Sequence, residues 1–110
     1  MAVIDDFYKL EIRTGVIREA RPFPEARKPA YQLLIDFGME IGTRGSSAQL
    51  ADRYSPEDLV GKTVLAVVNF PPRQIGPFLS DVLVLGVPDE HGKTVLVVPE
   101  AEVPRGARLY

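Results

Sequence analysis

The chain has 110 residues, with 13 Lys and Arg, 15 Asp and Glu, one His and no Cys, and its net charge is −2. This length predicts one domain over residues 1–110. The lack of Cys excludes disulfides, thiolate catalysis and Cys-based metal or iron–sulfur sites. Small secreted domains usually carry disulfides, so we expect a cytoplasmic protein. We expect no membrane insertion, because no apolar run approaches the roughly 20 residues of a membrane helix.

The charges are unevenly placed along the chain. Residues 13–28 contain five Lys and Arg against two Glu, whereas residues 81–102 contain one Lys against five Asp and Glu. An acidic protein does not coat nucleic acid through bulk positive charge. The uneven placement nevertheless leaves room for a local basic patch.

Short apolar runs separated by Gly and Pro predict a mainly β chain. Alternating Tyr31, Leu33, Ile35 and Phe37 are typical of a half-buried strand. Ser55-Pro56-Glu57-Asp58 predicts a helix N-terminus, because Ser is a favoured N-cap and Pro fits the first helical position. In chain order we predict a short helix at 5–9, a strand from Leu10 that passes Gly15 and ends at Pro22, strands at 31–37 and 39–46, short helices at 47–54 and from Ser55 to Gly61, strands at 63–70, 82–87 and 94–98, and an irregular tail at 104–110.

Five or more strands, with a helical insertion between the third and fourth, match the element order of an OB-fold. An SH3-like barrel is the alternative, but it has no natural place for a helix at 47–54. The predicted fold class is therefore all-β, a five-stranded Greek-key OB-fold barrel with short helices.

Two apolar runs predict a homodimer. Val82-Leu83-Val84-Leu85 and Val95-Leu96-Val97-Val98 are apolar at consecutive positions, as in strands that are buried on both faces. A barrel has one interior, so the second face needs another cover, and a two-fold partner is the commonest one. The N-terminal helix or the C-terminal tail is the alternative cover. The residues expected at the dimer interface are Leu83, Leu85, Leu96 and Val98.

The sequence offers little for catalysis. The single His, His91, lies in a polar hairpin connection at 88–93, where a solvated turn residue is expected. There is no clustered His, no EF-hand spacing and no phosphate-binding glycine motif. We therefore expect a binding protein that is not an enzyme and uses no cofactor and no metal.

Two proline-rich loops carry the candidate binding residues. In the first, three prolines between positions 22 and 29 stiffen a loop that presents Arg27 and Lys28, which suits phosphate contacts. The second, residues 69–80, interrupts the sheet at two prolines and offers aromatic, amide, hydroxyl and cationic groups. Such groups line platforms for single-stranded nucleic acids and also grooves for extended peptides. Solvated loops and core aromatic rings are the alternatives. The candidate peptide-binding residues are Phe70, Pro71, Pro72 and Phe78.

Three parts of the chain match a known family. Phe23-Pro24-Glu25-Ala26-Arg27-Lys28-Pro29-Ala30-Tyr31, followed by Ile35-Asp36-Phe37-Gly38, resembles the signature of the tRNA-binding domains appended to some aminoacyl-tRNA synthetases. Residues 46–48 and 55–62 resemble the helix segment of that family. Residues 69–86 resemble one branch more closely, the free-standing CsaA-type proteins. The resemblance extends from about residue 6 to the C-terminus.

The resemblance implies an OB-fold with a short N-terminal helix, found as a homodimer, that binds tRNA by its shape without catalysis. The CsaA branch is described as a chaperone with export-related activity that binds unfolded or pre-secretory chains. This chain is more acidic than many tRNA-binding relatives, and fewer cations neutralise fewer phosphates. Lys28, Asn69, Arg73 and Ser80 fall on motif positions of the family. Together with residues from the two loops, the set expected to bind RNA is Arg27, Lys28, Asn69, Arg73, Gln74 and Ser80.

Two functions remain open on sequence grounds. One is a homodimeric CsaA-like binding protein with a tRNA or RNA surface and chaperone-like binding of unfolded or export-related polypeptides. The alternative is a dedicated module for structured RNA without a chaperone role. Arg27, Lys28 and Arg73 favour RNA, whereas the Phe- and Pro-containing loop and the acidic balance favour polypeptides. The expected partners are tRNA or other structured RNA, unfolded polypeptides and a second copy of the chain.

Overall fold

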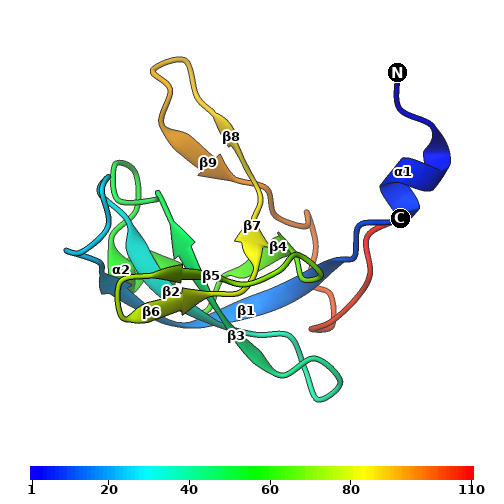
Figure 1. The fold of residues 1–110 in the computed structure, drawn as a ribbon, viewed down its shortest axis with the longest axis horizontal. Helices are drawn as coiled ribbons and strands as arrows, with labels where there is room; N and C mark the ends of the chain where they lie inside the picture. Colours follow the sequence, from blue (N-terminus) through cyan, green and yellow to red (C-terminus); the bar gives the residue numbers. More distant parts are fainter.

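Five antiparallel strands form a curved sheet in the order β3-β2-β1-β4-β7 in this computed structural model, which describes all 110 residues (Figure 1). The backbone N–H groups of Asp81 and Val82 donate to the Gly45 carbonyl of β3, at 2.8 and 3.2 Å, and so nearly close the sheet into a barrel. This architecture confirms the predicted all-β OB-like fold. The strands of the barrel are β1 (Ile12–Pro22), β2 (Tyr31–Asp36), β3 (Thr43–Ala48), β4 (Thr63–Val67) and β7 (Leu83–Val84).

Two hairpins and two short helices surround the barrel. The first hairpin, β5 (Arg73–Ile75) and β6 (Phe78–Ser80), lies across β3, whereas the second, β8 (Gly86–Pro88) and β9 (Thr94–Leu96), projects away from the barrel (Figure 1). Helix α1 (Ile4–Tyr8) projects separately, and α2 (Pro56–Leu59) packs beside β1. Neither helix has the length and apolar character that a membrane-spanning helix requires.

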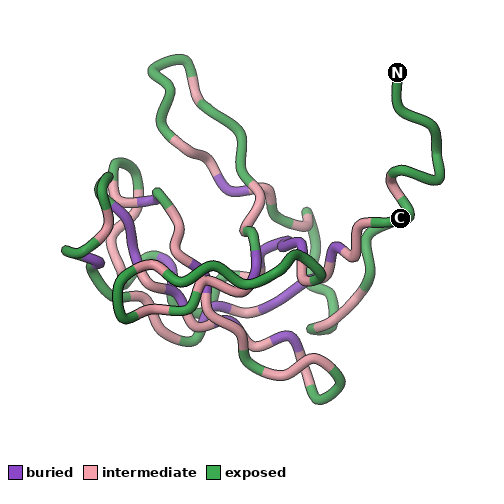
Figure 2. The backbone as a smooth tube through the Cα atoms, in the orientation of Figure 1, coloured by how far each residue is buried: buried purple, intermediate pink, exposed green.

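The core lies inside the barrel, and the alternation predicted for β2 places its side chains there. The side chains at these alternate positions, Tyr31, Leu33, Ile35 and Phe37, are all buried. By contrast, β8, the first strand of the projecting hairpin, is exposed (Figure 2). Burying an apolar side chain of this size contributes roughly 1.5–3 kcal/mol. The core cluster contains Ile17, Tyr31, Leu33, Ile35, Phe37, Leu50, Leu59, Val64, Ala66, Val82 and Leu96.

Gly15 lets two layers of this core approach closely. A Cβ atom on Gly15 would lie 2.6 Å from Cγ2 of Ile35 and 2.7 Å from the ring of Phe37. The sequence suggested a bulge or bend at Gly15, but the pairing of β1 with β2 shifts register between Ile17 and Glu19 instead. Gly15 therefore serves packing, and the irregularity of β1 lies a few residues later.

The predicted helix at 47–54 is wrong. Ser47 and Ala48 complete β3 by pairing with Gln32 and Tyr31, and only a turn follows at residues 51–53. The Ser47 N–H also donates to Oγ of Ser80, at 2.9 Å. Hydrogen bonds to two other segments therefore outweigh the local helical preference of this stretch.

Several predicted strands are shorter or broken in the structure, and one of them is the strand expected at 94–98, which ends at Leu96. The strand expected at 39–46 begins only at Thr43, because a turn spans residues 38–42, and the strand expected at 63–70 ends at Val67. The run 82–87 divides at Leu85, whose N–H donates to the Leu65 carbonyl at 2.9 Å while its own carbonyl accepts from the Val97 N–H at 3.1 Å. One apolar run therefore serves two different sheets.

The predicted start and end of α2 are confirmed. The Asp58 N–H donates to Oγ of Ser55 at 3.3 Å, and the Ser55 N–H donates to the Asp58 carboxylate at 3.1 Å, which lowers the pKa of Asp58. Gly61, just past the helix, adopts φ +93°, which favours glycine.

The C-terminal tail follows the first half of β1. The Thr14 N–H donates to the Ala107 carbonyl at 2.9 Å, the Gly106 N–H donates to the Thr14 carbonyl at 2.7 Å, and the Leu109 N–H donates to the Ile12 carbonyl at 2.8 Å. The tail has little regular structure, as predicted, but these bonds fix its position.

Candidate nucleic-acid interface

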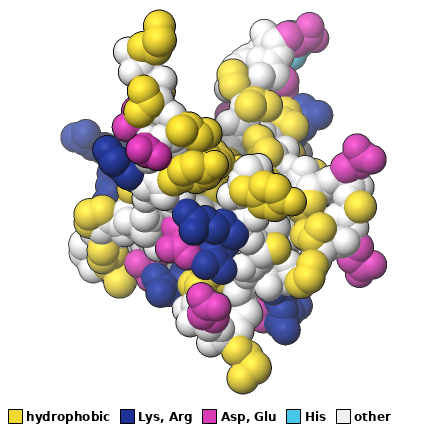
Figure 3. All heavy atoms as spheres, turned by 90° about the vertical axis from the view of Figure 1, so that its right-hand side faces the viewer, with side chains coloured by type: hydrophobic (Ala, Val, Ile, Leu, Met, Phe, Trp, Pro, Cys, Tyr) yellow, Lys and Arg dark blue, Asp and Glu magenta, His cyan; other side chains and the backbone are white.

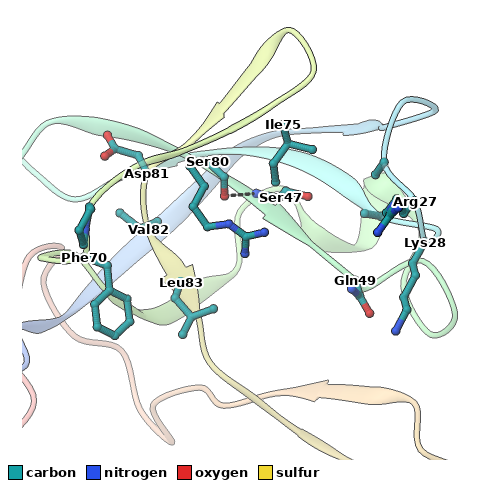
Figure 4. Close-up of a pocket in the computed structure, with 14 residues that line it drawn as sticks. Arg27, Lys28, Ser47, Gln49, Phe70, Ile75, Ser80, Asp81, Val82 and Leu83 are labelled. Atoms are coloured by element: carbon teal, nitrogen blue, oxygen red, sulfur yellow. Dashed lines mark hydrogen bonds between the residues drawn. The ribbon is translucent and has the colours of Figure 1, made fainter.

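A cavity of about 550 Å³ opens between the loop after β1, the end of β3 and the chain around β5 (Figure 4). Ligand sites in proteins commonly have volumes of about 300–1,000 Å³. We call this cavity the basic pocket. Its lining residues are Ala26, Arg27, Lys28, Ala30, Ser47, Gln49, Phe70, Pro71, Arg73, Ile75, Ser80, Asp81, Val82 and Leu83.

The loop at 24–29 forms one wall of the basic pocket. The Phe23 N–H donates to the Ala30 carbonyl at 3.1 Å, so the two ends of the loop are tied together. Phe23 is buried and packs edge-on against Phe78, with ring centroids 5.5 Å apart. This anchor leaves Arg27 and Lys28 exposed at the rim.

The β5–β6 hairpin and the chain leading into it form the opposite wall. Gly76 adopts φ +54° at the turn of this hairpin. The hairpin lies so close to β3 that a Cβ atom on Gly45 would be 2.8 Å from the Leu79 carbonyl oxygen and 2.9 Å from Cζ of Phe78. The barrel wall therefore sets the position of Arg73 and Ile75, the β5 residues that line the pocket.

The three cations that line the basic pocket have no carboxylate partner. Arg27, Lys28 and Arg73 take part in none of the ion pairs of the structure. The one acid of the pocket, Asp81, lies 3.4 Å from a guanidinium nitrogen of Arg44, which offsets its charge. The pocket therefore keeps a local excess of positive charge. Seven other cations do pair with acids, namely Lys9, Arg13, Arg18, Arg21, Arg44, Arg53 and Arg105.

A second cavity, of about 400 Å³, extends the basic pocket toward the β8–β9 hairpin. Ser47, Gln49, Arg73 and Leu83 line both cavities. The two cavities therefore form one groove, with the cations of the loop at one end and apolar side chains of the projecting hairpin at the other.

The structure brings together some of the residues predicted from sequence. Arg27, Lys28, Arg73 and Ser80, expected to bind RNA, line the basic pocket together with Phe70 and Pro71, expected to bind peptides. Pro72 and Gln74 are exposed outside it, and Phe78 faces Phe23 and lines a smaller cavity on another side. Four further lining residues were not predicted as site residues: Ser47, Gln49, Ile75 and Asp81. Only Gln49 lies outside the segments that resemble the family.

Asn69 does not line the pocket, and both ends of its side-chain amide are hydrogen-bonded. Its Oδ1 accepts from the Glu11 N–H at 2.8 Å, and its Nδ2 donates to the Lys9 carbonyl at 2.8 Å. Asn69 therefore ties the segment after α1 to the end of β4.

An exposed apolar surface lies between the N-terminal segment and the β8–β9 hairpin, the two projections at the top of Figure 3. Beneath it, Ile12, Leu65 and Val67 form a second buried cluster that Phe7, Leu10, Leu85 and Val97 cover only in part. Among the residues predicted at a dimer interface, Leu83 and Val98 are about half exposed and Leu85 is partly buried, whereas Leu96 belongs to the barrel core.

Carboxylates with perturbed pKa values lie outside the pocket. The Gly38 N–H, Arg18 and Arg105 lower the pKa of Asp36, and the N–H groups of Lys93 and His91 lower that of Asp89 in the turn of the β8–β9 hairpin. No group of three or more His, Cys, Asp or Glu gathers in a way that could hold a metal ion.

The sequence of this chain is similar to those of known tRNA-binding domains. The family described as "Putative tRNA binding domain" matches residues 12–108. A methionine–tRNA ligase of Bacteroides fragilis is 37% identical over 105 residues, which are 96% of this chain but 15% of the ligase. The chain thus spans a small part of the curated relatives it matches.

Solved structures match the chain over its full length. The chaperone CsaA of Bacillus anthracis is 49% identical with a TM-score of 0.93, and the alignment covers 100% of this chain and 99% of that one. The CsaA chaperone protein of Picrophilus torridus is 44% identical with a TM-score of 0.94, and the alignment covers 100% of both chains. The chain therefore belongs to the tRNA-binding domain family, as a relative of the CsaA proteins and of the tRNA-binding part of methionine–tRNA ligases.

Proposed function

We propose that this protein is a non-catalytic binding protein whose basic pocket and adjoining groove contact the phosphates of tRNA or a similarly structured RNA. The observation that carries the proposal is the meeting of three unpaired cations, Arg27, Lys28 and Arg73, from two segments far apart in the chain. Phosphate contacts supply most of the affinity in RNA and DNA complexes. Because tRNA is used in the cytoplasm, the proposal places the protein there.

Titration with tRNA over a series of salt concentrations tests the proposal. Three phosphate contacts in each subunit, doubled in a dimer, predict a slope of roughly −4 to −5 for the logarithm of affinity against the logarithm of salt. Lys28→Ala and Arg73→Ala should each weaken binding and reduce that slope by about one unit per lost contact. Lys62→Ala is the matched control, since Lys62 is also unpaired but lies outside the pocket. Affinity that is constant from low to high salt would contradict the proposal.

Polypeptide binding is the second candidate function. Phe70, Pro71, Ile75 and Leu83 give the groove an apolar side, and the prolines leave that side few conformations to lose on binding. The solved relatives named as chaperones support this candidate. Competition between tRNA and an unfolded polypeptide for the purified protein tests it. If the two ligands bind independently, the polypeptide binds to a surface other than the RNA-binding groove.

We also propose that two copies of the chain associate through the exposed apolar surface between α1 and the β8–β9 hairpin. Apolar patches of this kind, rimmed by polar residues, mark interaction sites. A two-fold dimer would bury on the order of 1,200 Å² or more in total. Sedimentation that shows only a monomer at micromolar concentration would refute this.

A further inference from the structure

We propose that the basic pocket holds one unpaired, unstacked nucleotide of the RNA, with its base on Phe70 and its phosphate toward Arg27 and Lys28. The inference rests on the proposed RNA-binding function and specifies which part of the RNA enters the pocket. Three features of the pocket support it: an aromatic ring without an aromatic partner, polar groups without hydrogen-bond partners, and two cations on the side opposite the ring.

The ring of Phe70 is available for stacking. Phe70 is 43% exposed, and its ring takes part in neither of the aromatic pairs of the structure. Pro71 and Leu83 line the pocket beside it, so the base would leave water on reaching the ring. Aromatic rings that accept bases in this way are typical of proteins that bind single strands.

Three polar groups of the pocket, besides Arg27 and Lys28, have no hydrogen-bond partner within the chain. The hydroxyl of Ser47, the side-chain amide of Gln49 and the guanidinium of Arg73 make no hydrogen bond within the chain, although all three line the pocket. Free donors and acceptors of this kind can bond the edges of an exposed base or its ribose.

Two of the three cations of the pocket lie on one side, whereas the third, Arg73, comes from β5 in the opposite wall. Figure 4 shows Arg27 and Lys28 on one side of the pocket and Phe70 and Leu83 on the other. A nucleotide has the same division, with an anionic phosphate at one end and an aromatic base at the other. In a duplex the base faces are stacked and covered, so a duplex can reach the cationic rim but cannot fill the pocket.

The test compares three RNA probes on the 110-residue protein. One is a short single-stranded oligoribonucleotide with one 2-aminopurine, the second is the same strand annealed to its complement, and the third is tRNA. We expect the single strand to bind at least fivefold more tightly than the duplex, with a change in 2-aminopurine fluorescence on binding. Phe70→Leu should weaken single-strand binding by about fivefold to a hundredfold, which corresponds to the loss of one base–ring stack. It should leave duplex binding unchanged.

Controls keep the outcomes distinct. Tyr110→Leu removes another exposed ring, which is 101% exposed and lies outside the pocket, and should change nothing. Thermal unfolding verifies that Phe70→Leu is folded. If tRNA binds with the expected salt dependence but single strands gain no advantage and Phe70→Leu has no effect, the nucleotide proposal is refuted and the proposed function stands. If no RNA binds, both fail. If Phe70→Leu weakens binding of an unfolded polypeptide alone, the ring belongs to a polypeptide site and the nucleotide proposal is overturned.

Discussion

Replacing Asn69 by Ala should loosen the attachment of the N-terminal segment to the barrel without changing RNA affinity. The side-chain amide of Asn69 bonds the Glu11 N–H and the Lys9 carbonyl, both at 2.8 Å. These two partners precede Asn69 by about 60 residues, so the amide joins distant parts of the chain. Neither partner lines the basic pocket.

The size of the effect follows from the two bonds. A typical intramolecular hydrogen bond contributes about 0.5–1.5 kcal/mol to stability. Because both of these are exposed to water, we expect Asn69→Ala to lower the free energy of unfolding by about 1–2 kcal/mol. For a domain of about this size, each kcal/mol corresponds to a decrease of roughly 4–8 °C in melting temperature.

Urea unfolding followed by circular dichroism measures this change, and a tRNA titration on the same sample measures affinity. Gln74→Ala is the control, because Gln74 was also predicted to bind RNA but donates only to the Gly76 carbonyl, two residues away. Its stability should stay within about 0.5 kcal/mol of the unsubstituted protein. An Asn69→Ala protein that keeps its unfolding midpoint and loses RNA affinity several-fold would refute the assignment of Asn69 to a structural role.

Acidification should weaken the attachment of the tail. The Gly38 N–H, with Arg18 and Arg105, lowers the pKa of Asp36 below 3.8, so the stabilisation is complete above pH 3.8 and is lost as the pH falls through the lowered pKa. In Asp36→Asn, the melting temperature should fall less as the pH is lowered than it does in the unsubstituted protein. The same dependence of melting temperature on pH in both proteins would contradict this prediction. Gly45→Ala should lower both the melting temperature and the RNA affinity. The new Cβ atom would lie only 2.8 Å from the Leu79 carbonyl oxygen, so the β5–β6 hairpin would have to move away from β3. Unchanged values for both would show that RNA binding and stability do not depend on the position of the hairpin. In sedimentation with circular dichroism, Val98→Lys should give a folded monomer because Val98 is 49% exposed, whereas Leu96→Lys should unfold because Leu96 is 7% exposed. A dimeric Val98→Lys protein would place the interface elsewhere.

The sequence predicted those elements whose signal is local. Alternation along β2 reflects a strand with one buried face, and the Ser55 cap uses atoms within three residues, so both could be read from a short window. The segment after Gly45 carries no such signal. Its strand exists because Ser47 and Ala48 bond residues of β2 and Ser80, contacts that a local pattern does not contain.

The residues of the candidate site also differ in whether a local sequence signal could predict them. Arg27, Lys28 and Arg73 were predicted because loops stiffened by proline mark exposed cations, and the structure places all three on one pocket. The position of Asn69 depends on a backbone segment about 60 residues earlier. Gln49 enters the pocket only because β3 extends to Ala48 and carries it there.

The position of the C-terminal tail bears on how the chain folds during synthesis. Residues 12–15 of β1 pair with β4 on one side, but β2 joins the other side only from Val16 onward, and the tail covers the rest. This contact joins residues 93 apart in sequence, and such long closures form late and slowly. Until residues 104–109 leave the ribosome, a stretch of β1 keeps unpaired backbone groups, which are a template for pairing with another chain. This edge of β1 is therefore covered only after residues 104–109 have been synthesised and have paired with it, and truncation before residue 104 should leave the edge open.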